Sequence, residues 1–344
     1  MLATAKPTKG RFCCTYFGRI SVCSDTEDDK SLVHIANYLL LKETSFTLEG
    51  VVEQLACTHN YAFFLIRRPT LKSYRIRIDG NTVTVLNFDV EHCEQLHFQR
   101  ADIRVEVKSM KLTCSVKQEE SCDTRKSSDH SQTCSKVPEL THCEENEKSI
   151  VEQMHNCDRP NRTNVPCGLI CCTDTTCYLI ANSENGPSLL MIFVENAIND
   201  EVKLLQIGCK EAIISLKAGK SHVLLLTASG MIYSFGTGTR GELGHGKLEN
   251  EQMPKLIDVL SIIPVVEIAC GSWHSVALTK DGDAYTWGWN CCGQMGSTDS
   301  SIIDFPLPLD IDWEIVAVSA YRNATLLKKA DGDVVVLGAI GYDT

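Results

Sequence analysis

Two histidines are the residues of this chain whose type and spacing best suit acid–base chemistry. His222 and His274 each stand three residues after a glycine, Gly219 and Gly271 respectively. Imidazole exchanges protons near neutral pH, so either histidine could act as a general base. Both occupy the same place in consecutive copies of a repeat, however, and a repeated position favours a structural role. We therefore expect each histidine to form a hydrogen bond with backbone groups of the next repeat.

Eighteen cysteines raise the question of a metal site. Half of them lie between residues 114 and 177, with His130, His142 and His155 among them. Structural zinc sites usually pair their cysteines as Cys-x-x-Cys, and this spacing occurs nowhere in the chain. Zinc is the alternative, but we expect no metal and no cofactor. We interpret the thiols as reduced, some of them buried in strands and others placed in a loop.

Other catalytic signatures are weak in this sequence. Gly236-x-Gly238-x-x-Gly241 matches the dinucleotide-binding string, but it lies inside an all-β repeat and opens no helix. Acidic pairs such as Glu119 and Glu120 lie in a polar stretch, which favours solvated charge over a paired-carboxylate site. No serine or cysteine nucleophile motif is present. The sequence therefore predicts a protein that is not an enzyme and has no small-molecule substrate.

The elements that hold these residues form a repeat with a period of 52 residues, clearest between residues 213 and 296. Each copy has two short apolar runs around a turn, Ser229-Gly230 in the first and Asp281-Gly282 in the second, which predicts strand, tight turn, strand. Stacking such hairpins radially buries both faces, so the period favours a propeller. The repeated positions are Gly219 and Gly271, His222 and His274, Gly230 and Gly282, Gly236 and Gly288, Gly241 and Gly293, and Gly244 and Gly296.

These motifs resemble the repeat of the regulator of chromosome condensation. The resemblance lies in Gly-x-x-His before the hairpin, Trp287-Gly288 after it, and the Gly-x-Leu-Gly string that runs from Gly241 to Gly244. It implies an all-β fold, a β-propeller of about seven blades, some of them degenerate. Two copies match strongly and cover about a quarter of the chain.

The whole chain, residues 1–344, is expected to form this single propeller. Residues 1–114 would supply degenerate N-terminal blades, and residues 167–344 the C-terminal blades. Residues 115–166 are rich in Ser, Glu, Lys, Asp, Thr and Asn, and cannot bury enough apolar area to offset their ordering entropy. We interpret them as a disordered polar insertion, which is either inert or a partner-binding segment.

Fainter copies of the repeat occur upstream. Residues 56–65 align without a gap with residues 269–278, and residues 170–180 form a poorer copy with a turn at Asn185-Gly186. Alternating segments at 81–87 and 103–114 could make a further degenerate blade.

The two ends of the chain suggest how the propeller closes. Residues 11–18 resemble a final strand, and residues 331–338 form a third hairpin that lacks the loop after it. We expect the strand near Phe17 to pair in the same blade as residues 334–337, since such pairing removes an open edge.

Three residues are candidates for contacts with a partner. Trp273 takes the place that Ser221 has in the other copy, so it is not a repeat constant and is free to serve binding. Arg240 and Glu249 lie in the loop after the blade, where they are either functional or merely solvated. For the protein as a whole, we expect a partner to bind the N-terminal half, including the insertion, with the regular blades as a frame.

The resemblance also implies a function. It implies a chromatin-linked scaffold for protein partners, with a JmjC-domain oxygenase as partner and an effect on histone methylation and chromosome stability. The alternative is the exchange of guanine nucleotide on a Ran-type small GTPase.

The net charge limits the kind of partner that we expect, and the N-terminal residues limit the cellular compartment. The net charge of −11 argues against nucleic acid as the main ligand and suits a basic partner such as a histone. Residues 1–9 do not form a signal peptide, and no apolar run is long enough for a membrane. We expect an intracellular protein, in the nucleus or on chromosomes with some in the cytoplasm.

Overall fold

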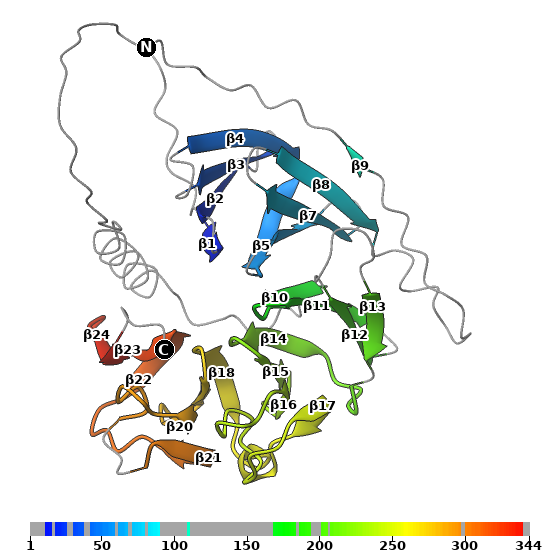
Figure 1. Ribbon diagram of the computed structural model, residues 1–344. Coiled ribbons are helices and arrows are strands. Elements are labelled where there is room, and N and C mark those ends of the chain that lie inside the picture. The colour runs from blue at the N-terminus through cyan, green and yellow to red at the C-terminus, as the bar shows by residue number, and fades with distance from the viewer. Residues whose placement is uncertain are drawn as a thin grey trace, which may run out of the picture.

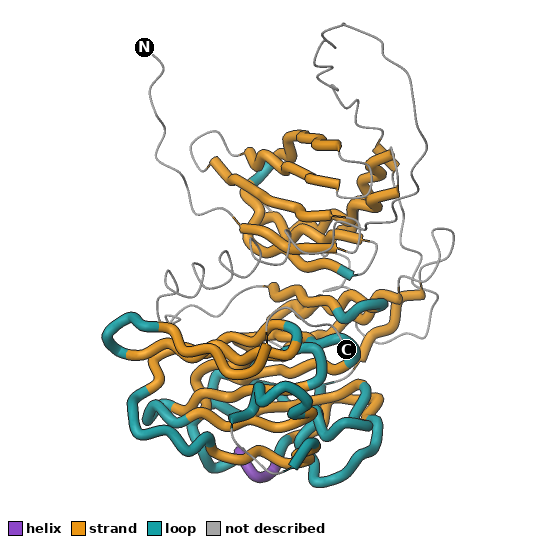
Figure 2. The backbone as a smooth tube through the Cα atoms, turned by 60° about the vertical axis from the view of Figure 1, so that its left-hand side comes forward, coloured by secondary structure: helices purple, strands orange, loops and turns teal. Residues whose placement is uncertain are grey.

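A computed structural model describes most of the repeat region and parts of the N-terminal half. The described residues are 11–15, 18–25, 30–37, 42–58, 61–67, 71–79, 82–89, 109–110, 168–183, 186–193, 201–205, 207–296 and 300–339. They are almost entirely strand and loop, and the short 3-10 helix η1 (Asp258–Leu260) is drawn in purple in Figure 2. None of the helices in this part of the chain is long and apolar enough to cross a membrane.

The strands form six antiparallel sheets, each built from consecutive segments of the chain. The first sheet consists of β1 (Arg11–Thr15), β2 (Gly18–Asp25), β3 (Lys30–Asn37) and β4 (Lys42–Glu49). The second consists of β5 (Val51–Cys57), β6 (Tyr61–Arg67), β7 (Leu71–Asp79), β8 (Thr82–Asp89) and β9 (Ser109–Met110). The third is β10 (Gly168–Cys172), β11 (Thr176–Ser183), β12 (Gly186–Phe193) and β13 (Glu201–Leu205).

The last three sheets contain the clear repeats. They are β14 (Ile213–Ala218), β15 (His222–Thr227), β16 (Ile232–Gly236) and β17 (Glu251–Leu256); then β18 (Val265–Cys270), β19 (His274–Thr279), β20 (Ala284–Trp289) and β21 (Ile302–Pro308); then β22 (Ile315–Tyr321), β23 (Asn323–Lys329) and β24 (Val334–Ala339).

The sheets follow one another around a curve, as the blades of a propeller do (Figure 1). The first strands of successive sheets, β1, β5, β10, β14, β18 and β22, pack against one another in chain order. Each blade is a small sheet that is too narrow to bury its own faces, so its apolar residues pack against the next blade. The buried cluster between the fourth and fifth blades illustrates this packing, because it joins Leu224 and Ile232 of one blade to Ile268 and Trp287 of the next.

The register shows that weak and strong repeats share one geometry. In the pair β18–β19, Ala269 lies opposite Val276, and the ladder shifts between Val265 and Glu267. The pair β5–β6 repeats this pattern 213 residues earlier: Ala56 lies opposite Phe63, with the shift between Val52 and Gln54. The faint copy at residues 56–65 is therefore confirmed as a blade hairpin, and the copy at residues 170–180 is confirmed as β10–β11.

Polar side chains of the first two blades form hydrogen bonds with backbone groups at the boundary with the blade that follows. The Ser31 hydroxyl donates to the carbonyl of Gly50, at 2.8 Å, and accepts from the N–H of Val52, at 2.9 Å. The Gln54 amide accepts from the N–H of Ile170 at 2.9 Å. Because each of these bonds satisfies a backbone group at a blade boundary, they fix neighbouring sheets in register.

Asn182 makes a similar junction one blade later. Its side-chain amide donates to the carbonyl of Ile213 at 2.8 Å and accepts from the N–H of the same residue at 2.9 Å. The junction between the fifth and sixth blades uses a carboxylate instead, because Glu267 Oε2 accepts from the N–H of Val318 at 3.0 Å.

Two expectations about strand placement are wrong. The N-terminal strand β1 pairs with β2 in the sheet of β1 to β4, and among the described residues the sheet of β22, β23 and β24 takes no strand from the N-terminal part of the chain. Phe17 itself lies outside the described residues. Residues 82–89 and 109–110 do not start another blade, since β8 and β9 extend the sheet of β5. In both cases a strand pairs with its neighbour along the chain, because closing the shorter connection costs less entropy than pairing with a more distant segment.

Six blades are seen in the described residues, against the expected seven. The proposed insertion at residues 115–166 lies outside them, as do most of the cysteines considered as zinc ligands.

Candidate functional site

The order of strands within a blade places its loops on two opposite faces. Among the described residues, the first and third loops of a blade, such as residues 219–221 and 237–250, lie at one end of the strands. The second loop and the connection to the next blade, such as residues 280–283 and 309–314, lie at the other end. We call the first end the tryptophan face, because it carries Trp273, and the second the hairpin face.

On the tryptophan face, the Gly-x-x-His motif acts as one structural unit. A Cβ at Gly219 would lie 2.2 Å from Cε1 of His222, and a Cβ at Gly271 would lie 2.0 Å from Cε1 of His274. The glycine therefore leaves room for the imidazole ring. In both copies the glycine N–H also donates to the carbonyl of the histidine, at 2.9 Å. The spacing seen in the sequence is thus explained by the close contact of a ring with a residue that lacks a side chain.

Each histidine reaches into the next blade. His222 Nε2 lies 3.0 Å from Oγ of Ser275, and His274 Nε2 lies 2.9 Å from Oγ1 of Thr325. The expected direction is right, but the partner is a side-chain hydroxyl where a backbone group was expected. Burial lowers the pKa of His222 to about 4 and that of His274 to about 3. Both rings are therefore neutral at physiological pH and act as hydrogen-bonding groups in a sealed site.

A second link between the same blades uses the carbonyl of Glu242. It accepts from the Ser275 hydroxyl at 2.9 Å and from the indole N–H of Trp287 at 2.9 Å. Trp287 is fully buried, as expected for the residue that matches Phe235 in the other copy. Ser275 thus joins His222 to this carbonyl, and the three contacts form one network across the blade boundary. These partners could not be recognised in the sequence, because they lie about 30 to 50 residues from one another along the chain.

The carboxylate of Glu242 shapes the loop that carries Arg240. Its Oε2 accepts from the backbone N–H of Arg240 at 2.7 Å, and its side chain is fully buried. Burial raises the pKa of this carboxyl group. The next copy repeats the arrangement with an amide, since Gln294 Oε1 accepts from the N–H of Cys292 at 2.9 Å. A buried acceptor at this position therefore holds the loop in both blades.

Two of the three predicted partner-binding residues come together on the tryptophan face. The Arg240 guanidinium carbon lies 4.0 Å from the ring centre of Trp273 and 5.1 Å from that of Trp289, and Lys220 Nζ lies 6.0 Å from the Trp273 ring. Such cation–π contacts are stabilising when the cation lies over the ring within about 6 Å. Trp289 was missed as a site residue, although it follows the repeated Gly288 directly.

Glu249, the third predicted residue, lies exposed in the same loop as Arg240. Its carbonyl comes so close to Gly238 that a Cβ there would lie 2.0 Å away. The structure therefore gives Glu249 a backbone role in closing the loop, while its carboxylate faces solvent.

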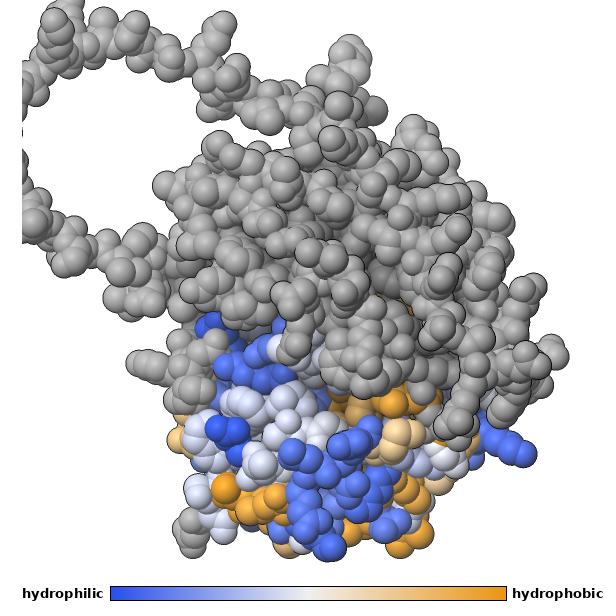
Figure 3. All heavy atoms as spheres, turned by 45° about the vertical axis from the view of Figure 1, so that its right-hand side comes forward, coloured by the Kyte–Doolittle hydropathy of each residue, from blue (hydrophilic) through white to orange (hydrophobic). Residues whose placement is uncertain are grey.

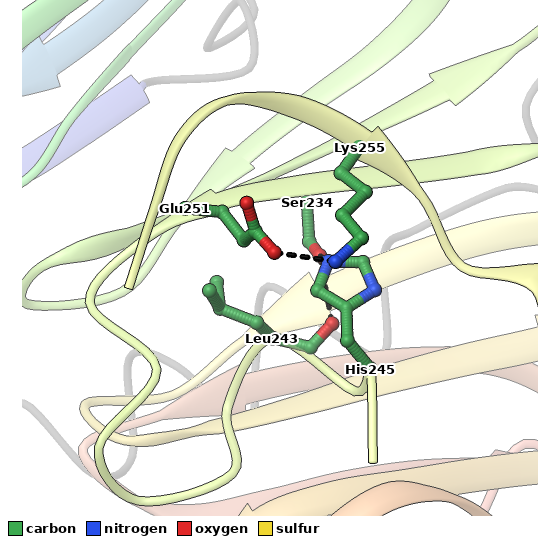
Figure 4. A network of polar contacts seen from close by, with 5 residues as sticks. All are labelled: Ser234, Leu243, His245, Glu251 and Lys255. Carbon is green, nitrogen blue, oxygen red and sulfur yellow. Dashed lines mark hydrogen bonds and ion pairs between the residues drawn. The ribbon is translucent and has the colours of Figure 1, made fainter. Parts of the chain in front are cut away.

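A polar network closes the end of the Arg240 loop (Figure 4). The Ser234 hydroxyl donates to the carbonyl of Leu243 at 2.7 Å, and its oxygen lies 2.9 Å from Nε2 of His245. Lys255 and Glu251 form an ion pair beside the ring. Burial and the charge of Lys255 lower the pKa of His245, so the ring is neutral and suited to hold the loop against β16.

In the coloured part of the surface in Figure 3, hydrophilic residues lie between groups of hydrophobic ones. Exposed large apolar residues include Leu248, Met253, Ile262 and Phe305. In the part of the chain that the structure describes, no group of three or more His, Cys, Asp or Glu residues is placed to hold a metal ion.

Small antiparallel sheets that follow one another as blades, with Gly-x-x-His units that join neighbouring blades, define a β-propeller fold. The family model named Regulator of chromosome condensation (RCC1) repeat matches residues 229–278, and a second model of this repeat matches residues 265–294. Residues 229–294 therefore match repeats of the RCC1 type within a β-propeller fold.

Similar proteins support this assignment. The chain is 48% identical over 120 residues to RCC1 domain-containing protein 1 of Homo sapiens, which covers 35% of this chain and 29% of that protein. It is 49% identical over 80 residues to the protein of the same name in Mus musculus, covering 23% of this chain and 21% of that protein. The chain thus matches less than a third of the length of either relative.

The crystal structure of human WBSCR16 is similar in fold, with a TM-score of 0.53 and 17% sequence identity, over 86% of this chain and 64% of that one.

Proposed function

We propose that this propeller is a non-enzymatic scaffold that binds protein partners through its tryptophan face. The observation that carries the proposal is the position of Arg240 over the rings of Trp273 and Trp289. Tryptophan and arginine are the residues most enriched among the side chains that dominate binding energy at protein interfaces. Here they lie on loops of a rigid sheet scaffold, which is where binding residues concentrate.

This proposal moves the binding surface away from the N-terminal half, where the sequence favoured it. The loop of residues 237–250 is held by Glu242, by the network around His245 and by the close approach of Glu249 to Gly238. A loop fixed in this way presents its side chains without a large ordering entropy on binding.

The finer form of the proposal is that the partner is a JmjC-domain oxygenase and that the complex acts on chromatin, in the nucleus. It is supported by the resemblance of the repeats to the branch named RCC1 domain-containing protein 1. The net charge of −11 suits such a setting, since it favours basic partners such as histones over nucleic acid.

The test is the affinity of the purified full-length chain for a purified JmjC-domain oxygenase, measured by calorimetry. Arg240→Ala removes the cation on the tryptophan face. Lys329→Ala is the matched control, because Lys329 Nζ lies 5.1 Å from the ring centre of Trp313 on the hairpin face. We expect Arg240→Ala to weaken the complex by about tenfold or more and Lys329→Ala to leave it unchanged.

Equal affinities for the wild type and both variants would contradict the proposed face. Accelerated release of nucleotide from a Ran-type GTPase by the wild type, together with no binding of the oxygenase, would favour the exchange-factor alternative instead.

A further inference from the structure

The donors of the Arg240 guanidinium are available for a ligand. Its contacts with Trp273 and Trp289 engage the positive charge with the aromatic rings, and such contacts leave the N–H groups at the edge of the guanidinium plane unused. Among the described residues, none accepts a hydrogen bond from this guanidinium. The backbone of Arg240 is fixed separately, by the bond from its N–H to Glu242. The side chain is thus positioned by stacking and keeps its hydrogen-bonding capacity.

The N–H groups at the edge of the Arg240 guanidinium are suited to bind a planar anion. A guanidinium presents parallel N–H donors that match the two oxygens of a carboxylate, and the paired geometry is stronger than a single hydrogen bond. Two indole rings beside the cation exclude water from part of its surface. A less hydrated site strengthens the attraction to an opposite charge. The cluster is therefore suited to receive one carboxylate side chain.

The charges of the three repeat blades differ between the two faces. In the described loops of β14 to β24, the exposed or half-buried charges of the tryptophan face are four cations and one carboxylate, because Glu242 is buried. They are Lys220, Arg240, Lys247, Arg322 and Glu249. The hairpin face carries eight exposed carboxylates and Lys280 in its loops. These carboxylates are Asp258, Asp281, Asp283, Asp310, Asp312, Glu314, Asp331 and Asp333.

This asymmetry orients an anionic ligand toward the tryptophan face and repels it from the hairpin face. A long polyanion would meet the net charge of −11 over the whole molecule, which disfavours nucleic acid. A short segment with one or two carboxylates meets only the local positive charge.

We propose that the tryptophan face binds an acidic peptide segment of its partner, with an Asp or Glu carboxylate paired to the edge of the Arg240 guanidinium. This inference rests on the proposed function and names the chemistry of the partner. Trp273 and Trp289 position the guanidinium, and Lys220 adds positive charge beside Trp273.

A peptide array tests the inference without knowledge of the partner. Each twelve-residue peptide is printed in four versions that differ only at the central residue, which is Glu, Gln, phosphoserine or Lys. The full-length wild type, Arg240→Ala, Arg240→Lys and Lys329→Ala are applied at two salt concentrations. We expect the wild type to bind Glu versions about tenfold or more above Gln versions, because a hydrogen bond between charged groups is lost in the Gln version.

The variants assign this preference to one residue. Arg240→Ala should remove the difference between Glu and Gln versions, and Arg240→Lys should keep only part of it, since an ammonium lacks the paired donors. Lys329→Ala should behave as the wild type. The absence of bound peptides, or equal binding of the Glu and Gln versions, would overturn the inference. A preference for phosphoserine over Glu would replace the carboxylate with a phosphate.

The array separates this inference from the proposed function. If Arg240→Ala weakens the oxygenase complex but the array shows no preference for Glu, the tryptophan face binds a partner by other chemistry and only the inference fails. If Arg240→Ala leaves the oxygenase complex intact while the array shows the Glu preference, the proposed use of the face with that partner fails and the acidic-peptide site stands.

Discussion

His274 Nε2 lies 2.9 Å from Oγ1 of Thr325, a residue of the next blade, and both side chains are fully buried. The equivalent bond one blade earlier joins His222 to Ser275. These two bonds show that the repeated histidines connect blades. They also explain why a residue that suits acid–base catalysis recurs at a fixed position in a repeat.

His274→Ala should lower the free energy of unfolding by about 1–3 kcal/mol, because it leaves the Thr325 hydroxyl buried without its partner. Thr325→Val removes the other half of the same bond with little change of shape. The two single variants and the double variant form a cycle, measured by urea denaturation. A double variant that loses the full sum of the two single losses would show that the bond contributes little. Unchanged stability with lost partner binding would assign His274 to the interaction surface.

Stability should fall with acidity over a defined range of pH. The pKa values of His222 and His274, about 4 and about 3 in the folded protein, lie below the value near 6.5 of an unfolded chain. The unfolded chain therefore binds protons first as the pH decreases. The histidines leave stability unaffected above about pH 6.5, and lower it as the pH falls from there toward 4 and 3. Urea denaturation at a series of pH values checks this. The variant His222→Ala should show a shallower loss, and an equally steep loss would contradict the assignment.

Gly241→Ala should destabilise the protein more than Gly293→Ala does. The two glycines occupy the same place in the repeat, with φ of 80° and 79°. Alanine in this left-handed conformation costs about 1–2 kcal/mol at either site. A Cβ at Gly241 would in addition lie 2.6 Å from the carbonyl oxygen of Ile303, whereas none of the described atoms lies within 4 Å of one at Gly293. Thermal and urea denaturation of the two variants measure the difference, and equal losses would show that the loop shifts to make room.

Glu267→Ala should cost about 1–3 kcal/mol, because the N–H of Val318 loses its acceptor at a blade boundary. Glu267→Gln keeps an acceptor oxygen and replaces the carboxyl group, whose pKa is raised by burial, with an uncharged amide. It should therefore unfold close to the wild type. If the amide variant is as unstable as the alanine variant, the charge, held near Lys217, matters more than the hydrogen bond.

Two alterations test which half of the molecule binds the partner. One removes residues 115–166, and the other replaces residues 237–249 with a glycine–serine loop of equal length. We expect the second to weaken the complex with the oxygenase, because it removes Arg240 from its place over Trp273. Circular dichroism controls for folding. Loss of binding only in the first variant would restore the N-terminal half as the binding region.

Much of the fold could be predicted from the sequence. The 52-residue period placed the strand pairs β14–β15, β15–β16, β18–β19 and β19–β20, since glycines at fixed offsets mark the turns and short apolar runs mark the strands. Even the weak copy at residues 56–65 gave the correct register, because a hairpin is a local structure whose pairing depends on nearby residues.

Contacts between blades were decided only by the tertiary structure. The sequence indicated that His222 and His274 reach the next blade, but not that Ser275 and Thr325 receive them. It suggested Arg240 and Trp273 separately as binding residues. Packing of adjacent blades places the guanidinium carbon of Arg240 4.0 Å from the ring centre of Trp273.

The N-terminal strand shows the same limit. The matching open ends of the repeat predicted that β1 would complete the last blade, and β1 instead pairs with β2. Period and hairpin signals are short-range properties, so they determine each blade. Which blade a terminal strand joins, and which side chains meet across a boundary, depends on the competition between distant partners, and only the folded chain resolves it.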